Sequence, residues 1–584
     1  MPEVVDPRQL GVSVLGQGGG ILTGVYDIIS SIDYVNSKNL KAYIASFDMV
    51  KAYDRSSTAY LEKVTEKMAF PEMFRSWLQM LHSGATTRLI LPSGLSKEIK
   101  VTFSFRQGDC ISGDLYCLNQ EPLLRMLRNR LVGLYVAYFF QKDTSYLDDV
   151  ELLSGDEEDL VKFNSIMKSY EAQSGAMLSR GKKSKVMGLG QWQGREHWPQ
   201  EVGWLQTVSS MKILGFVVCP HYQETVQKTW DMVFRGFQKT LFSWGGRTLS
   251  TLQQRVNVLQ TFALSKLWYV AQVLPLPEKM IKKIESSLSA FIFRGRHERL
   301  KLDELENPRS RGGLGLVCVA TKAECLLLCQ TLRVLKRRGS NCNKHLSFWI
   351  GSELNEAFPE LTDRGPVNLS RCPLHKTLLA TLEEGLLRQE YKPTALDEAT
   401  SKMIYASRSA DVIPPPIPGV NFLELVYPRL NSKVLEAEPR DALFCMVHNL
   451  HPNRERLHQQ RRAQDAYCPL PQCQGQVQDR EHLFSSCYLV SQAWLWLRTK
   501  LLQLLPTTVG AAAVSSEEFL FLRFPKDTME KELVWLIGNY CDIVLKVTIA
   551  KKRRLSADHV SSLMKSRLQS LKQRAVVQPL LFIL

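Results

Sequence analysis

Three carboxylates stand where they could hold metal ions together. Asp48 ends residues 41–48, whose composition predicts a β-strand, and the adjacent acids Asp148 and Asp149 separate two β-rich runs within residues 133–153. Adjacent acids at a hairpin tip repel each other, so a buried site needs cations to keep them ionised. Magnesium, which prefers a few carboxylates together with substrate phosphates, suits such a set. A solvated turn with a strand-end cap is the structural alternative.

A second set of possible metal ligands lies near the end of the chain. Cys468, Cys473, His482 and Cys487 form a C-x4-C-x8-H-x4-C pattern. Thiolates and an imidazole at short spacings suit tetrahedral zinc, which can order a segment too small to have its own core. The spacing differs from that of a standard finger, and a chance selection among thirteen cysteines is the alternative. Nearby basic residues suit RNA binding: Arg454, Arg456, Arg461 and Arg462.

An α+β front and an all-helical back must position these residues. Hydrophobic periodicity predicts helices in the front half over residues 21–36, 57–82 with a break at Pro71, 113–130 and 156–173. Strand-like runs also lie at residues 87–103 and 211–218. From about residue 224 the pattern is helical, with an apolar face over residues 252–270. The proline-rich residues 408–428 make the best domain linker.

Length and composition narrow the class of protein. A chain of 584 residues suggests about three or four domains. The net charge of +16 favours polyanion partners because each neutralised phosphate releases counterions, although a solubilising surface gives the same total. Cysteines set in apolar helical stretches suit a reducing compartment, and the amino terminus lacks the layout of a secretion signal. No run of about 18 uncharged apolar residues occurs, so we expect a nuclear or cytoplasmic protein without a membrane span.

The motifs resemble, in order, those of reverse transcriptases from non-LTR (LINE-type) retrotransposons. FDMVKAYD, residues 47–54, is similar to their first catalytic motif after a strand. Arg106-Gln107-Gly108-Asp109, followed by Ser112, resembles their R-Q-G-x-x-x-S motif, and YLDD at residues 146–149 resembles their Y-x-D-D hairpin. The later motifs also resemble the family's: Ser174-Gly175-Ala176, Lys183-Ser184, residues 212–215, 249–270, 291–293 and 311–316. Any one motif is weak evidence, but their common order over residues 20–320 is strong evidence.

The resemblance implies an α+β right-hand polymerase: a palm with partial fingers, a helical thumb and an all-helical C-terminal region. Tryptophans after the Cys/His pattern, Trp494 and Trp496, resemble the family's zinc knuckle. The basic tail, from Lys551-Lys552-Arg553-Arg554 onward, is expected to be helical and to hold template RNA, to act as a nuclear address or to form a solvated face. The expected parts are 1–220 partial fingers and palm, 221–320 thumb, 321–430 connector and linker, 431–500 zinc-knuckle-like region and 501–584 basic tail.

The resemblance also implies a role for the carboxylates. Asp48, Asp148 and Asp149 would hold two magnesium ions, which stabilise the attacking and leaving oxygens when a primer hydroxyl attacks a deoxynucleotide. The partners would be an RNA template, a DNA primer or target and deoxynucleoside triphosphates. Tyr53 matches the aromatic position under the incoming sugar, where its bulk excludes a 2′-hydroxyl. An ordinary core aromatic is the alternative for Tyr53.

Other matching residues are expected to contact template or nucleotide. Gly108 matches the glycine that lets the backbone approach the nascent base pair, where a side chain would collide. Lys183 would protonate the departing pyrophosphate, and Lys182 stays open as the alternative because of an apparent insertion. The remaining nucleotide or template contacts are Lys51, Arg106 and Gln107.

Several departures from the family pattern favour a second hypothesis. About 47 residues precede Asp48, so we expect shortened fingers, and no apurinic-type endonuclease domain is expected. Cys110 and Gly113 replace two usual prolines, and Asp143-Thr144-Ser145 is polar for a buried palm strand. These features suit a catalytically inactive, truncated remnant that binds nucleic acid. A protein-interaction scaffold built on the helical back half is a more remote third hypothesis.

Overall fold

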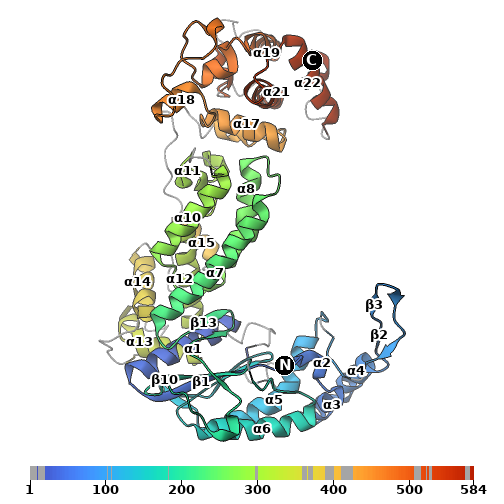
Figure 1. Ribbon diagram of the computed structural model, residues 1–584, viewed down its shortest axis with the longest axis vertical. Coiled ribbons are helices and arrows are strands. Elements are labelled where there is room, and N and C mark those ends of the chain that lie inside the picture. The colour runs from blue at the N-terminus through green and yellow to red at the C-terminus, as the bar shows by residue number, and fades with distance from the viewer. Residues whose placement is uncertain are drawn as a thin grey trace. The chain divides into compact units, whose positions relative to one another are not determined.

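The chain forms two compact units in the computed structural model (Figure 1). The first consists of Met1–Arg235, Leu267–Pro277 and Lys322–Ser407, and the second of Gly236–Lys266, Glu278–Thr321 and Arg408–Leu584. The five-part division made from the sequence remains a prediction. The structure describes residues 5, 9–10, 20–101, 103–106, 108–181, 183–295, 300–357, 365, 373–387, 400–408, 425–505, 515–520, 522–524, 529–571 and 579–584.

A five-stranded sheet forms the centre of the first unit. Its order is β11-β10-β1-β9-β8, and the central strand β1 pairs antiparallel with both β9 and β10. Ala42–Ala45 of β1 are wholly buried, which explains why this strand is an almost uninterrupted apolar run. The strands are β1 (Lys41–Phe47), β8 (Asp143–Tyr146), β9 (Asp149–Ser154), β10 (Lys185–Gly190) and β11 (Gln206–Thr207).

Helices cover this sheet, with α5 and α6 on one side and α1 on the other (Figure 1). Phe47 of β1 stacks on Phe163 of α6, with ring centroids 3.9 Å apart, inside the main apolar core. The predicted helices are confirmed: α1 (Gly20–Ser37), α3 (Thr58–Lys67), α4 (Glu72–His82), α5 (Ser112–Arg130) and α6 (Glu158–Ser174), with Pro71 between α3 and α4. The other helices of this unit include α2 (Ala52–Arg55), α13 (Asn341–Ala357), α14 (Pro373–Leu387) and α15 (Ser401–Arg408).

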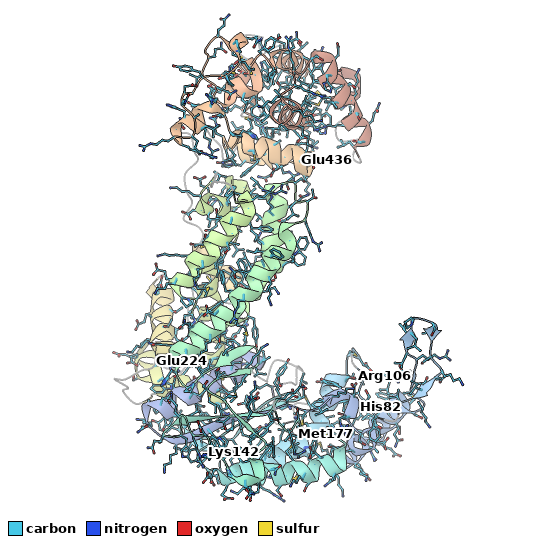
Figure 2. The ribbon with its side chains drawn as sticks, viewed as in Figure 1. His82, Arg106, Lys142, Met177, Glu224 and Glu436 are labelled. Carbon is cyan, nitrogen blue, oxygen red and sulfur yellow. The ribbon has the colours of Figure 1, made fainter. Side chains whose placement is uncertain are left out.

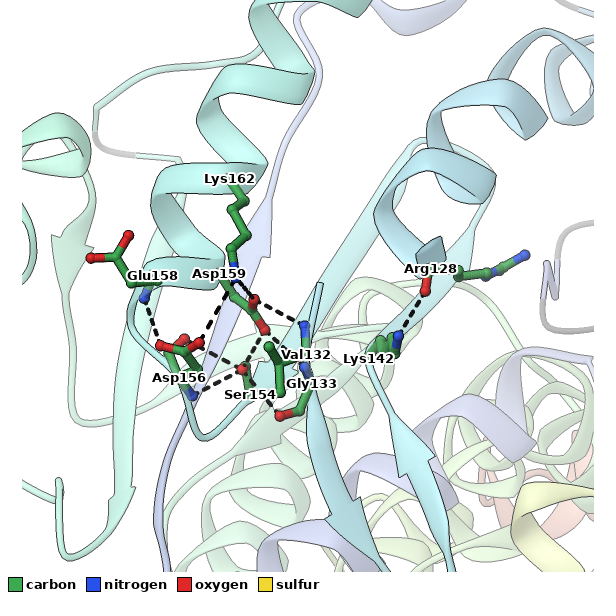
Figure 3. A network of polar contacts seen from close by, with 9 residues as sticks. All are labelled: Arg128, Val132, Gly133, Lys142, Ser154, Asp156, Glu158, Asp159 and Lys162. Carbon is green, nitrogen blue, oxygen red and sulfur yellow. Dashed lines mark hydrogen bonds and ion pairs between the residues drawn. The ribbon is translucent and has the colours of Figure 1, made fainter. Parts of the chain in front are cut away.

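A buried carboxylate ties the first turn of α6 to the turn before β6 (Leu134–Val136) (Figure 3). Asp159 accepts hydrogen bonds from the backbone N–H groups of Val132 (3.0 Å) and Gly133 (2.8 Å) and from the Ser154 hydroxyl (2.7 Å). Gly133 has φ +77°, and a Cβ there would lie 2.5 Å from the carbonyl oxygen of Gln141. These contacts fix the end of the β8–β9 hairpin opposite its turn.

A buried ion pair explains the polar strand β8. The Arg128 guanidinium donates to both carboxylate oxygens of Asp143, with Nη2 to Oδ2 at 2.8 Å, and both side chains are almost fully buried. Gln141 of β7 (Phe139–Gln141) donates to the Thr144 hydroxyl at 3.0 Å. The polarity of Asp143 and Thr144 is therefore matched by partners inside the first unit, whereas the buried Ser145 hydroxyl has no hydrogen-bond partner among the described residues.

One surface of the first unit is strongly apolar and open to water. The expected strand region 87–103 consists of two small hairpins, β2 (Thr86–Thr87) with β5 (Ile99–Lys100) and β3 (Ile90–Leu91) with β4 (Gly94–Leu95). Ile90 at the tip is 88% exposed. We call the exposed side chains of α4 and these hairpins the α4 apolar face: Met73, Trp77, Met80, Leu81, Leu89, Ile90, Leu91, Leu95, Ile99 and Phe103. A face of this size is unusual on a monomer.

The described part of the second unit is helical, as predicted. Helix α21 (Glu530–Val544) is its centre and buries nearly every side chain, including Trp535 and Tyr540. The other long helices are α10 (Glu278–Phe293), α17 (Ala437–Val447), α19 (Ser491–Gln503) and α22 (Ala557–Ser570). Shorter helices are α8 (Leu252–Val258), α11 (Leu302–Glu306), α16 (Tyr427–Leu430), α18 (Arg454–Gln459), α20 (Ser516–Leu520) and α23 (Leu580–Ile583).

Three details differ from the expected elements. The predicted strand 211–218 is a hairpin, β12 (Met211–Ile213) with β13 (Phe216–Val218), because Leu214 and Gly215 both take positive φ. The predicted helix 252–270 contains a π-helical segment, Leu259–Leu264, and its last helical turn ends at Trp268. Helices α7 (Tyr222–Gly245) and α12 (Val319–Lys336) are regular, and no described helix is both long and apolar enough to cross a membrane. Residues 409–424 of the expected linker lie outside the described residues.

Candidate active site and metal centre

Strand pairing brings the three predicted carboxylates together. Asp48 directly follows β1, Asp148 lies in the turn between β8 and β9, and Asp149 begins β9. Because Phe47 pairs with Val150, Asp48 and Asp149 are neighbours across the two strands. Leu147 takes φ +52° in the turn, and its side chain packs against the apolar cluster that contains Phe105 and Tyr116. That packing holds the hairpin tip in a backbone conformation that is rare for leucine.

The electrostatics of this cluster favour a bound cation. Burial raises the pKa of Asp149 to about 6, and the charges of Asp148 and Asp48 add to the effect. Burial also raises the pKa of Asp148, with a further contribution from Asp48. The cation that faces them is the ammonium of Lys183, whose Nζ lies 3.2 Å from Asp48 Oδ2 in a well-exposed pair. An exposed pair of this kind offsets little repulsion, so the oxygen atoms remain available to divalent ions.

Tyr53 lies beside the carboxylates on helix α2. Its ring stacks on Tyr116 with centroids 4.9 Å apart, and a Cβ on Gly113 would lie 4.0 Å from the Tyr53 hydroxyl. Burial raises the pKa of Tyr53, and the nearby charge of Asp148 contributes. The backbone carbonyl of Tyr53 also accepts from the N–H of Phe105, so the ring is fixed from two sides.

The other predicted contact residues surround this centre less tightly. Arg106 donates to the carbonyl of Leu81 at 3.1 Å, and Figure 2 places it next to His82 at the end of α4. Gly108 has φ +93° with open space where a side chain would project, and Lys51 is exposed at the start of α2 with φ +47°. Two predicted positions, Gln107 and Lys182, lie outside the described residues.

Two residues near the carboxylates were missed in the sequence. Tyr116 supports Tyr53 from α5, and its position within an apolar helix gives no sign of that role. Glu151 lies two residues after Asp149 and is buried, with Oε2 lacking a hydrogen-bond partner. Burial first, and then the charge of Asp149, raises the pKa of Glu151 well above its usual value. An acid inside an otherwise apolar strand was the signal that could have found it.

The four predicted zinc ligands also converge. The ligand atoms of Cys468, Cys473, His482 and Cys487 all lie within 4.8 Å of one another, and the four residues are buried. The Cys473 and Cys487 sulfur atoms are 3.9 Å apart, far beyond a disulfide bond. Zinc–sulfur bonds of about 2.3 Å would place two tetrahedral sulfur ligands about 3.8 Å apart. The spacing therefore fits a zinc ion.

Local structure orients these ligands before any metal binds. Nε2 of His482 is buried without a hydrogen-bond partner, whereas Nδ1 lies 3.1 Å from the Ser486 hydroxyl. A partner on one ring nitrogen leaves the other for a metal, an arrangement common in metal sites. The backbone N–H of Cys468 donates to Gln476, and burial raises the pKa of the Cys487 thiol to about 12. Metal binding would therefore have to displace a proton from the Cys487 thiol.

Comparisons with known proteins find one matching family and several similar proteins. Residues 14–218 match the family described as reverse transcriptase (RNA-dependent DNA polymerase). The Transposon TX1 uncharacterized 149 kDa protein of Xenopus laevis is 26% identical over 352 residues, covering 57% of this chain and 25% of that protein. Among solved structures, apo telomerase from Candida tropicalis is 13% identical with a TM-score of 0.33, covering 60% of this chain and 57% of the other. A telomerase from Candida albicans, in complex with a TWJ fragment of telomeric RNA, is also 13% identical with a TM-score of 0.26, covering 55% and 51%.

Residues 14–218 are thus a reverse transcriptase domain with a polymerase-like α+β fold. The chain is also similar, over 352 residues, to a transposon protein. The chain spans about a quarter of the length of the curated relative that it matches.

Proposed function

We propose that this chain is an RNA-directed DNA polymerase that extends a DNA primer along an RNA template. The observation that carries the proposal is the convergence of Asp48, Asp148 and Asp149 at one end of the β1, β8 and β9 strands, within a domain of the matching family. The exposed oxygen atoms and raised pKa values of the last two acids suit a pair of magnesium ions.

Each residue of the site has a task in this reaction. Asp48, Asp148 and Asp149 would hold two magnesium ions, which would stabilise the negative charge on the attacking and leaving oxygens. Tyr53, fixed by Tyr116, lies under the incoming sugar and excludes a 2′-hydroxyl. Lys183 gives a proton to the pyrophosphate after nucleotide transfer. Further template and nucleotide contacts come from Lys51, Arg106, Gln107 and Gly108.

Other parts of the chain serve the same reaction in this proposal. Residues 1–220 form partial fingers and palm, 221–320 a thumb, and the Cys/His cluster a zinc knuckle that contacts RNA. The net charge of +16 supports a nucleic-acid partner. The described cysteines are free of disulfides, which suits the nucleus or cytoplasm.

Primer extension tests the proposal. The full chain, an RNA template, a DNA primer, magnesium and deoxynucleotides should give extended DNA, and Asp148→Ala should abolish it. Asp156→Ala is a matched control because Asp156 lies at the opposite end of β9. Incorporation no greater than that of Asp148→Ala would refute the enzymatic function.

The α4 apolar face favours a second candidate, a catalytically inactive remnant that binds nucleic acid. That face adjoins Arg106 and leaves ten large side chains in water. In this case the wild-type chain and Asp148→Ala would bind RNA equally, with affinity that falls as salt rises, and neither would extend a primer.

A further inference from the structure

Four consecutive basic residues form an exposed loop in the second unit. Lys551, Lys552, Arg553 and Arg554, here called the basic loop, lie between the π-helical Leu545–Ile549 and α22, so the expected helix is wrong at this point. Lys552 takes φ +51°, a conformation that costs a lysine about 1 kcal/mol. None of the four forms an ion pair within the described part of the chain. Four adjacent cations held in this way repel one another and attract a polyanion.

The basic loop is attached directly to the Cys/His cluster. The N–H of Leu555, next to the loop, donates to the carbonyl of Leu489 at 2.9 Å. The Arg554 guanidinium lies 4.2 Å from the centre of the Tyr488 ring and donates to its hydroxyl at 3.1 Å. The backbone N–H of Tyr488 in turn donates to Cys473 Sγ at 3.4 Å. Tyr488 thus contacts both Cys473, a possible metal ligand, and Arg554, a cation of the basic loop.

We propose that zinc in the Cys/His cluster fixes the basic loop as a binding site for the phosphate backbone of single-stranded RNA. The inference rests on the proposed function for the identity of the polyanion. The loop contains no apolar side chain that a protein partner would bury, and its cations are unpaired, so phosphate groups are its natural ligands. Zinc determines how tightly these cations are positioned.

The coupling follows from the chemistry of the thiols. When zinc binds, Cys473 is a thiolate, and its hydrogen bond from the Tyr488 N–H becomes charge-assisted and stronger. Without zinc no ion joins Cys473 to Cys487, whose sulfur lies 3.9 Å away, and the buried His482 Nε2 has no hydrogen-bond partner. Tyr488 then loses its anchor, and Arg554 loses the ring and hydroxyl that hold it. A loosened loop loses conformational entropy when it becomes ordered on RNA, and this loss lowers the binding affinity.

Fluorescence anisotropy of a short unstructured single-stranded RNA, titrated with the full chain, tests this coupling. With zinc bound, Lys551→Gln/Lys552→Gln should lower affinity about tenfold and reduce the salt slope by about 1.4, since each phosphate contact on a single strand contributes about 0.7. After chelation the same double substitution should cost twofold or less. Lys565→Gln, in the adjacent helix α22, removes a cation that is not attached to the cluster and should have little effect in either state.

Two further variants separate fixing of the loop from loss of folding. Tyr488→Leu should retain zinc, about one ion per chain, yet show the weakened affinity of the chelated protein. Restoring zinc to the chelated wild type should recover binding, which shows that the protein had not unfolded irreversibly. The proposal would be overturned if the double substitution lowered RNA affinity by the same factor with and without zinc. It would also be overturned if Lys565→Gln lowered the affinity as much as the double substitution does. Primer extension is measured in a separate assay. If the chain binds RNA in a zinc-dependent way but does not extend a primer, only the proposed polymerase activity is refuted.

Discussion

Replacing Asp159 with alanine should unfold the end of the β8–β9 hairpin that lies far from its turn. The carboxylate is wholly buried and accepts from two backbone N–H groups and the Ser154 hydroxyl. Hydrogen bonds to a charged group contribute about 1.5–3 kcal/mol each, and the two backbone donors would be left without a partner, whereas the Ser154 hydroxyl also lies 3.3 Å from the carbonyl oxygens of Gly133 and Asp156. Because the turn can relax and admit water, the sum is an overestimate, and we expect a loss of about 3–5 kcal/mol.

Hydrogen exchange of β8 and β9 measures this loss locally. Amides of these strands should exchange at least a hundredfold faster in Asp159→Ala, whereas β12 and β13 should change less. Glu158→Ala is the control, since Glu158 is exposed and its side chain makes none of these bonds. The yield of primer extension should decrease in Asp159→Ala together with the protection of these amides from exchange, because Asp148 and Asp149 lie on the same hairpin. A loss below about 1 kcal/mol, or one equal to that of Glu158→Ala, would refute the reasoning.

Three further outcomes are expected. Arg128→Met should cost about 3–5 kcal/mol in urea unfolding by leaving Asp143 buried and unpaired, and Asp143→Leu added to it should restore most of the loss. Burial raises the pKa of Asp27 from 3.8 to about 7, so the folded chain binds that proton more tightly and loses stability as pH rises from about 4 to 7. Asp27→Asn should therefore flatten the dependence of the unfolding midpoint on pH and be the more stable form at pH 8, and a less stable variant there would contradict this. Trp77→Gln with Ile90→Ser should reduce binding of an apolar dye without lowering the thermal midpoint, because both side chains already contact water.

Local patterns predicted most of the elements that carry the site. The apolar run before Asp48, the helical periodicity of α5 and α6, and the acid pair between two β-rich runs are each encoded within a few adjacent residues. The Cys/His spacing was equally informative because its ligands lie within twenty residues of sequence, inside one small fold.

Contacts between distant residues could not be predicted in the same way. No residue adjacent to Asp143 in the sequence indicates that Arg128 will be buried beside it. The ion pair nevertheless explains how an aspartate can lie in this buried strand. Tyr116 and Glu151 acquire their places only when β1, β9 and α5 meet. Lysine and arginine are good helix formers, which favours a helix for the basic loop, whereas in the structure the Arg554 side chain donates to the Tyr488 hydroxyl and the N–H of the next residue, Leu555, donates to Leu489. The side chains of the α4 apolar face, finally, follow helical and strand-like periodicity, yet within the described part of the chain they remain exposed.

The antiparallel register of β1 and β9 makes the site sensitive to small changes in chain length. Phe47 pairs with Val150, so the acids that follow and precede these residues meet only at this register. Shifting either strand by one residue would turn its side chains to the opposite face of the sheet and bury an unpaired carboxylate. A single inserted residue within 41–47 or 149–154 should thus separate the three acids as surely as the loss of an aspartate. The same insertion in the exposed β3–β4 tip should leave them together, so the effect of a short insertion depends on which strands it displaces.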